Sequence, residues 1–107
     1  MKYRSAPKTV DGIRFDSKKE ANRYIVLKGM VETGEIWDLR RQVKFTLTKA
    51  GRLPSGKWLR ESSYLADFVY QTKNGQVVED VKGYRTKEYI LKKKMMWHIH
   101  QIEIKEV

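Results

Sequence analysis

Apolar residues recur at every second position in several stretches of this chain, which is the period of a β-strand with one buried face. Residues 42–48 show this period most clearly, because valine, phenylalanine and leucine there alternate with lysine and threonine. We expect further strands at residues 58–70, 76–82 and 99–107, and a small hairpin at residues 9–15. Residues 49–57 hold two glycines, a proline and three cations, so they predict a loop.

Two other stretches place their apolar residues at helical spacing. The first begins after Ser17, an expected N-cap, and stops at Gly34. The second covers residues 87–98 behind the cap Thr86. Its expected apolar face consists of Tyr89, Ile90, Met96 and Trp97.

The order of these elements predicts the fold class. A strand, a helix and a further strand at the end of the chain imply a right-handed crossover to a parallel neighbour. We therefore expect an α/β fold with a mixed β-sheet flanked by two helices. A single domain would cover residues 9–107 behind a flexible basic arm at residues 1–8.

Charge and composition narrow the function. The chain has 107 residues with 23 Lys and Arg against 13 Asp and Glu, which gives a net charge of +10. Such an excess attracts polyanions, of which nucleic acid is the usual one, although the charge would also serve solubility alone. Zero cysteines exclude disulfides and thiolate metal sites. The lack of cysteine also fits a cytoplasmic protein. No apolar run reaches the roughly 20 residues of a membrane span, and the first residues lack the apolar core of a signal peptide, so we expect no membrane contact.

Two acidic residues and one lysine are expected to meet on one face of a hairpin. Asn74 and Gly75 are the strongest short hairpin signal in the chain, and taking them as the two turn residues fixes the register. Asp67 then lies opposite Lys82 and diagonal to Asp80. Because residues two apart share a face, Asp80 and Lys82 point the same way. Two carboxylates and one ammonium therefore converge on one patch.

This convergence predicts the hydrolysis of phosphodiesters. One or two carboxylates suffice to hold Mg²⁺, because this ion keeps several of its waters, and Lys82 would stabilise the charge that grows on the phosphate. The alternative is a solvent-exposed face on which Asp67 and Lys82 form a cross-strand ion pair. Against the alternative, aspartate disfavours strands, and two of them in an apolar stripe need a reason. Glu79 is expected to point to the opposite face as a surface charge.

The same residues resemble the motif of a nuclease superfamily. Asp67, with twelve residues between it and the run Asp80, Val81 and Lys82, matches the PD-(D/E)xK pattern. Ala66 stands where the pattern has proline. The wider segments 10–21, 64–70, 78–83 and 102–105 look like one family of small phage and prophage proteins, placed in this superfamily and long labelled a domain of unknown function. The resemblance implies a restriction-endonuclease-like mixed sheet flanked by two helices.

The resemblance also implies roles for single residues. The implied metal ligands are Glu20, Asp67, Asp80 and the backbone carbonyl of Val81. The implied catalytic residues are Glu20, Asp67, Asp80 and Lys82, with Lys82 as the catalytic lysine. Glu20 has a second interpretation, since Ser17 and Glu20 have the spacing of a capping box. Gln42 resembles a glutamine found near such sites.

The substrate is expected to be DNA, held mainly through its phosphates. The cations expected to contact it are Lys49, Arg52, Lys57, Arg60, Lys92, Lys93 and Lys94. Trp58 is the aromatic residue expected to be open for base stacking. The domain leaves no room for a separate base-reading module, so DNA shape and backbone charge are the expected recognition code.

The resemblance completes the functional hypothesis. It implies an endonuclease dependent on Mg²⁺ or Mn²⁺, encoded by a phage or prophage and acting in the cytoplasm of the bacterial host. Holliday-junction resolvases of this superfamily act as dimers, so branched DNA is the expected substrate and a homodimer the expected assembly. The alternative function is a non-catalytic DNA-binding module of a phage replication or packaging complex.

Overall fold

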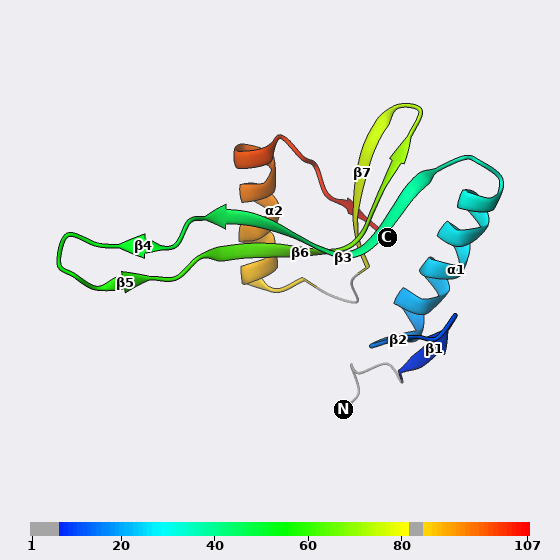
Figure 1. Ribbon diagram of the computed structural model, residues 1–107, viewed down its shortest axis with the longest axis horizontal. Helices are drawn as coiled ribbons and strands as arrows, with labels where there is room; N and C mark the ends of the chain where they lie inside the picture. Colours follow the sequence, from blue (N-terminus) through cyan, green and yellow to red (C-terminus); the bar gives the residue numbers. More distant parts are fainter. Residues whose placement is uncertain (1–6, 82–84) are drawn as a thin grey trace.

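The computed structural model describes residues 7–81 and 85–107 (Figure 1). Its elements in chain order are β1 (Lys8–Val10), β2 (Ile13–Phe15), α1 (Lys18–Glu32), β3 (Trp37–Thr48), β4 (Gly51–Arg52), β5 (Trp58–Leu59), β6 (Ser62–Thr72), β7 (Gly75–Asp80), α2 (Lys87–His100) and β8 (Lys105–Glu106). The predicted flexible arm at residues 1–8 falls mostly outside the described residues, and Lys8 already belongs to β1.

A four-stranded mixed sheet forms the centre of the molecule. Its strand order is β3-β6-β7-β8, and the pairs β3–β6 and β6–β7 are antiparallel. The chain leaves β7, passes through α2 and returns as β8, which pairs with β7 in parallel. Figure 1 shows α2 beside one half of the β3–β6 pair and α1 beyond the other half. The predicted α/β fold, with a mixed β-sheet and two helices, is therefore confirmed.

Strand β6 serves two hydrophobic cores and changes sides between them. Tyr64 and Ala66 pack in the core around α2, whereas Phe68 and Tyr70 pack in the core around α1. These four residues are spaced by two and would share one face of a regular strand. The change of side falls at Asp67, which is partly buried between the two cores.

Strand β3 changes sides at the matching position. Leu39 packs against the α1 core, while Val43 and Phe45, at the same parity, pack against the α2 core. Gln42 lies between them with a left-handed backbone, φ 52°. A non-glycine residue rarely adopts this conformation, and its cost is of order 1–3 kcal/mol. The two strands therefore switch cores together at Gln42 and Asp67.

Local signals in the sequence are confirmed at several element ends. Asp11 and Gly12 both have positive φ, 53° and 75°, as a two-residue type I′ turn requires. The Ser17 hydroxyl caps α1 by accepting from the amide of Glu20 at 3.1 Å. Thr86 caps α2 in the same way. These signals are read correctly because the chemistry that ends each element lies within a few residues of it.

The turn between β6 and β7 differs from the prediction. Its two residues are Lys73 and Asn74, so Thr72 pairs with Gly75. The Thr72 hydroxyl explains the difference, because it accepts from the amide of Asn74 at 3.0 Å and donates to the carbonyl of Gly75 at 3.0 Å.

The register of the hairpin moves with its turn. Phe68 pairs with Glu79, and Asp67 and Asp80 come next along the two strands. The predicted register, which paired Asp67 with Lys82, is therefore wrong. Lys82 itself lies outside the described residues.

Three predicted elements also need correction. Residues 49–57 are not a simple loop, because β4 and β5 pair within them as the end of a projecting hairpin. The predicted strand at 99–107 shrinks to β8, since α2 continues to His100 and is capped by the left-handed Gln101. On α2, Ile90 and Trp97 are exposed, so the predicted apolar face holds only at Tyr89 and Met96.

In the part of the chain that the structure describes, neither helix has the length and apolar character needed to span a membrane.

Candidate functional site

Glu20 lies in the first turn of α1 and is almost fully buried. Within the described residues, its carboxylate contacts β3 rather than the amide of Ser17, so only half of the predicted capping box forms. Gln42 donates from Nε2 to Glu20 Oε2 at 3.2 Å, and Arg41 Nη2 lies 3.8 Å from the same oxygen. The Glu20 side chain therefore does not cap α1. It points to the place where β3 and β6 pass from one hydrophobic core to the other.

Asp67 faces the same glutamine from β6. Gln42 Nε2 reaches Asp67 Oδ1 at 3.5 Å, so one amide nitrogen stands between two carboxylates. The other oxygen, Asp67 Oδ2, accepts the backbone N–H of Val81 at 2.7 Å. Glu20, Gln42 and Asp67 together are called the acidic cluster below. Gln42 is exposed, so the cluster opens to solvent on its side.

Electrostatics in the acidic cluster favour a bound cation. Burial raises the pKa of Glu20, the negative charge of Asp67 raises it further, and Arg41 only partly offsets both effects. A carboxylate that resists ionisation is stabilised in its charged form by a positive ion beside it. Glu20 is thus held in a less favourable state than a carboxylate in water.

Asp80 lies next to the acidic cluster but is directed into the α2 core. Its side chain is 1% exposed, and Tyr64 donates a hydrogen bond to Asp80 Oδ2 at 2.5 Å. Burial, followed by this bond to Asp80, raises the pKa of Tyr64 well above its ordinary range. Tyr64 therefore remains a neutral donor that fixes the position of Asp80.

The predicted surface position of Glu79 is wrong. Glu79 is fully buried, and Arg23 of α1 binds both of its oxygens at 2.8 and 2.6 Å. Tyr70 donates a further hydrogen bond to the same carboxylate. Arg23 and Glu79 are called the buried ion pair below, and they attach β7 to α1 beside the acidic cluster. The only hint in the sequence is that Glu79 sits among valines in a central strand.

The donor set of the acidic cluster fits a hard divalent cation. Among residues 7–81 and 85–107, no group of three or more Asp, Glu, His or Cys side chains is arranged to hold a metal. Mg²⁺ does not need one, because it keeps several waters and is bound through one or two carboxylates. Glu20 and Asp67 supply two such oxygens from separate elements, and the cluster is open to solvent at Gln42.

Sequence comparison places the chain in a family. The model of the family described as "Protein of unknown function (DUF1064)" matches residues 1–106. The chain belongs to the DUF1064 family. A comparison with curated proteins finds no match. For this DUF1064 protein the predicted family label is thus confirmed, while the relationship to PD-(D/E)xK nucleases and the phage origin stay predictions.

The predicted site residues of the DUF1064 chain fall into three groups. Glu20, Gln42 and Asp67 come together, and Val81 joins them through its N–H, so its predicted carbonyl role stays a prediction. Asp80 is adjacent but occupied by Tyr64. Lys82 lies outside the described residues, and its catalytic role stays a prediction.

The predicted DNA-contacting cations divide between two places. Lys49, Arg52, Lys57 and Arg60 all lie on the projecting hairpin and are exposed. On α2, Lys92 pairs with Glu88 at 3.1 Å and Lys93 with Glu106 at 3.2 Å, whereas Lys94 is exposed. The hairpin therefore offers more uncompensated charge than the helix.

Sequence reasoning missed two residues of this region. Arg41 contacts Glu20 and lies over the ring of Phe15, 4.5 Å from its centroid. Tyr64 holds Asp80. Tyr64 lies two residues before Ala66 and three before Asp67 in the sequence, but nothing in the sequence indicates that it bonds to Asp80.

Proposed function

We propose that this protein is a DNA endonuclease that uses Mg²⁺ or Mn²⁺ to hydrolyse phosphodiesters, with branched DNA as its preferred substrate. The observation that carries the proposal is the acidic cluster, in which Glu20 and Asp67 flank a single amide nitrogen and Glu20 has a raised pKa. An almost fully buried acid beside a second, partly buried one carries an electrostatic cost that needs a reason, and a metal site supplies one.

Each residue of the site has a task in this proposal. Glu20 and Asp67 would hold the cation, and the N–H of Val81 orients Asp67 by binding its second oxygen. A divalent cation held there would polarise a phosphoryl oxygen and lower the pKa of a bound water. Gln42 keeps the two carboxylates in place, and Arg41 limits the repulsion between them. Asp80 is proposed as a further ligand and Lys82 as the lysine that stabilises the developing charge.

The positive charge of the chain supports DNA as the substrate. The net charge of +10 favours a polyanion, and the exposed cations of the hairpin suit phosphate contacts. Paired cuts in a branched molecule need two active sites, so we propose a homodimer. The proposed place of action is the cytoplasm of a bacterial host.

Cleavage of a substrate panel tests the proposal. The protein is incubated with Mg²⁺ or Mn²⁺ and a four-way junction, a nicked duplex, a linear duplex and a single strand. We expect cutting of the junction, its loss in Asp67→Asn with DNA binding retained, and no loss in Asp38→Asn. Asp38 is a matched control, because it is an exposed aspartate on β3 outside the acidic cluster. Equal cutting by Asp67→Asn, or no cutting of any substrate with either metal, would reject the endonuclease and leave the DNA-binding module.

A further inference from the structure

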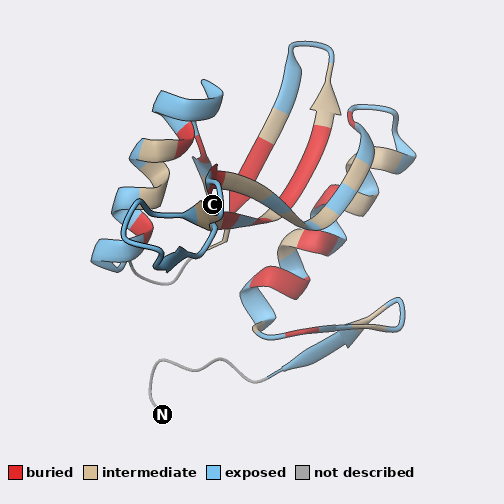
Figure 2. Cartoon of the chain, turned by 60° about the vertical axis from the view of Figure 1, so that its left-hand side comes forward, coloured by how far each residue is buried: buried red, intermediate tan, exposed pale blue. Residues whose placement is uncertain are grey.

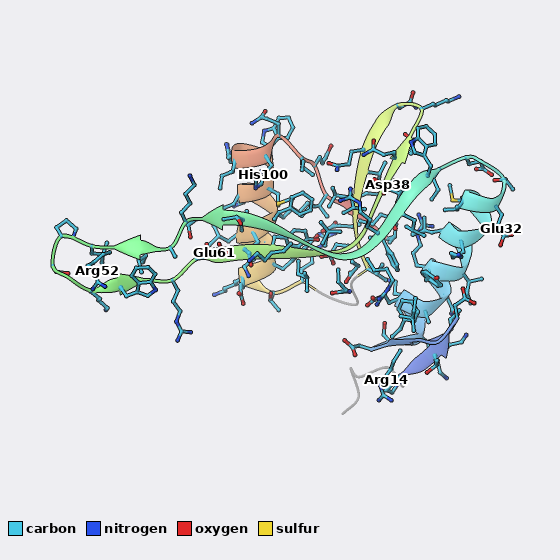
Figure 3. The ribbon with its side chains drawn as sticks, viewed as in Figure 1. Arg14, Glu32, Asp38, Arg52, Glu61 and His100 are labelled. Carbon is cyan, nitrogen blue, oxygen red and sulfur yellow. The ribbon has the colours of Figure 1, made fainter. Side chains whose placement is uncertain are left out.

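The hairpin that joins β3 to β6 is a two-stranded arm. Gly51 pairs with Leu59 and Arg52 with Trp58, and the turn is closed by two backbone hydrogen bonds of 2.8 Å. The turn has proline at its second position and ends at Gly56, with φ 91°, which is the pattern of a three-residue hairpin loop. Figure 1 shows the arm extending past α2, and Figure 3 shows Arg52 far from Asp38 at the other end of the molecule.

The arm exposes large apolar side chains, none of which belongs to either hydrophobic core. Trp58 is 57% exposed, Leu59 46% and Leu53 39%, and Figure 2 shows almost the whole arm as exposed. An isolated two-stranded hairpin is at best marginally stable in water, so apolar residues on it are of use chiefly to a partner.

Charge indicates which kind of partner the arm takes. Between residues 48 and 62 the chain has four cations, Lys49, Arg52, Lys57 and Arg60, and a single acid, Glu61. Glu61 is already bound by Lys44 of β3 at 2.7 Å. Across residues 7–81 and 85–107, none of the four arm cations takes part in an ion pair with a described partner. The four arm cations would repel the net charge of +10 on a second copy, so the proposed dimer contact does not lie on the arm, whereas the arm attracts a polyanion.

The pairing of Arg52 and Trp58 indicates what the polyanion must offer. The Arg52 guanidinium lies 5.7 Å from the centre of the Trp58 ring, and Arg52 Nη1 donates to the carbonyl of Gly56 at 2.7 Å. This cation stiffens the tryptophan as a stacking platform. In an intact duplex every base face is covered by its neighbours, so an apolar platform gains little there. At a branch, gap or single-stranded junction, base faces are open.

We infer that the arm recognises unstacked DNA, with Trp58 stacking on an exposed base while the flanking cations contact phosphates. The inference rests on the proposed function for its ligand and deepens it, because it assigns the preference for branched DNA to the arm rather than to the acidic cluster. Leu53 and Leu59 would extend the apolar contact around the base.

Binding without divalent metal tests the inference apart from cleavage. With EDTA present, the affinities for a gapped duplex and for an intact duplex of the same sequence are measured by fluorescence anisotropy. We expect Trp58→Ala to weaken binding to the gapped duplex about fivefold or more, with less than about twofold effect on the intact duplex, and Trp58→Phe to retain most of the affinity. Arg60→Ala is the matched control and should weaken both complexes alike, since it removes a phosphate contact.

A spectroscopic readout accompanies the affinities. In a chain carrying Trp37→Phe and Trp97→Phe, Trp58 is the sole tryptophan, and its fluorescence should be quenched by the gapped duplex more than by the intact one. The inference is overturned if Trp58→Ala weakens both complexes equally, if no quenching occurs, or if sedimentation shows that Trp58→Ala dissociates a dimer. Because this binding is measured without metal, a failure to cleave in the separate assay with Mg²⁺ or Mn²⁺ would reject the nuclease while leaving the arm's selectivity standing.

Discussion

The buried ion pair and the acidic cluster both link the first half of α1 to the sheet, through Arg23 and Glu20, but their carboxylates have different surroundings. Glu79 is fully buried, yet Arg23 binds both of its oxygens and Tyr70 supplies a third hydrogen bond. Among the described partners, Glu20 has the amide of Gln42 and a guanidinium at 3.8 Å, and a second carboxylate stands beside that amide. The first arrangement balances its charge, and the second does not.

This difference separates a structural acid from a functional one. A buried carboxylate with a bidentate arginine has no capacity left for a ligand, so Glu79 contributes to the fold. An acid whose pKa is raised by burial and by a like charge weakens the fold when ionised, and such groups cluster at functional sites. The position of an acid next to a motif is thus less informative than the charges that surround it.

The largest expected effect is on cleavage. Asp67→Asn should lower cleavage on the order of 10³-fold, roughly 4 kcal/mol in activation free energy, because a neutral amide is a poor ligand for a hard cation. Steady-state rates with Mg²⁺ measure it. Asp38→Asn is the control, because Asp38 is an exposed aspartate on the neighbouring strand β3. This variant should cleave at the wild-type rate.

The second-largest expected effect is on stability, through the loss of the buried ion pair. Arg23→Ala leaves Glu79 buried without its cation and should reduce the free energy of unfolding by about 3 kcal/mol. Urea unfolding measures the change. An unfolding free energy within about 0.5 kcal/mol of the wild type, the usual range for surface substitutions, would mean that the two clusters do not differ as described.

Glu20→Gln should move activity and stability in opposite directions. Cleavage is expected to fall ten- to hundredfold, roughly the cost of disturbing a metal ligand shell. A carboxyl whose pKa is raised by folding stabilises the fold while it is protonated. This contribution is lost as the pH rises from 4.5, the ordinary pKa of the carboxyl, through its pKa in the folded protein. The variant should therefore melt higher than the wild type at pH 7, and this gain should shrink as the pH falls through the folded pKa and vanish below about 4.5. A large fall in melting temperature with full activity would instead favour helix capping.

The smallest effect concerns the backbone at Gln42. Gln42→Gly removes the cost of a left-handed side-chain-bearing residue and should stabilise the chain by up to about 1 kcal/mol, while cleavage falls because the bridge between the carboxylates is lost. Asp38→Gly is the matched control, since Asp38 has φ 54° on the same strand. It should give a similar gain in melting temperature with cleavage unchanged.

The sequence predicted most of the elements because their signals are local. Ser17, Gly34 and Thr86 mark helix ends through bonds that span only a few residues. The crossover from β7 through α2 to a parallel β8 follows from the element order and handedness. Asp67 was predicted from the hairpin pattern and its motif, and Glu20 from the resemblance to the nuclease superfamily.

The errors arise where a partner lies far away or where one side chain decides a conformation. Glu79 was placed on the surface because its partner Arg23 is 56 residues away. The hydroxyl of Thr72 moved the turn by one residue and changed the register of Asp67. No periodicity reveals that Gln42 is left-handed and that β3 and β6 change cores beside it.

Calorimetric titration of Mn²⁺ tests the central claim most directly, because it asks whether the acidic cluster holds a cation without requiring a substrate. The account predicts one binding event in the wild type, its loss in Asp67→Asn, and its persistence in Asp38→Asn. Equal Mn²⁺ binding by the wild type and Asp67→Asn, or no binding by the wild type, would contradict it.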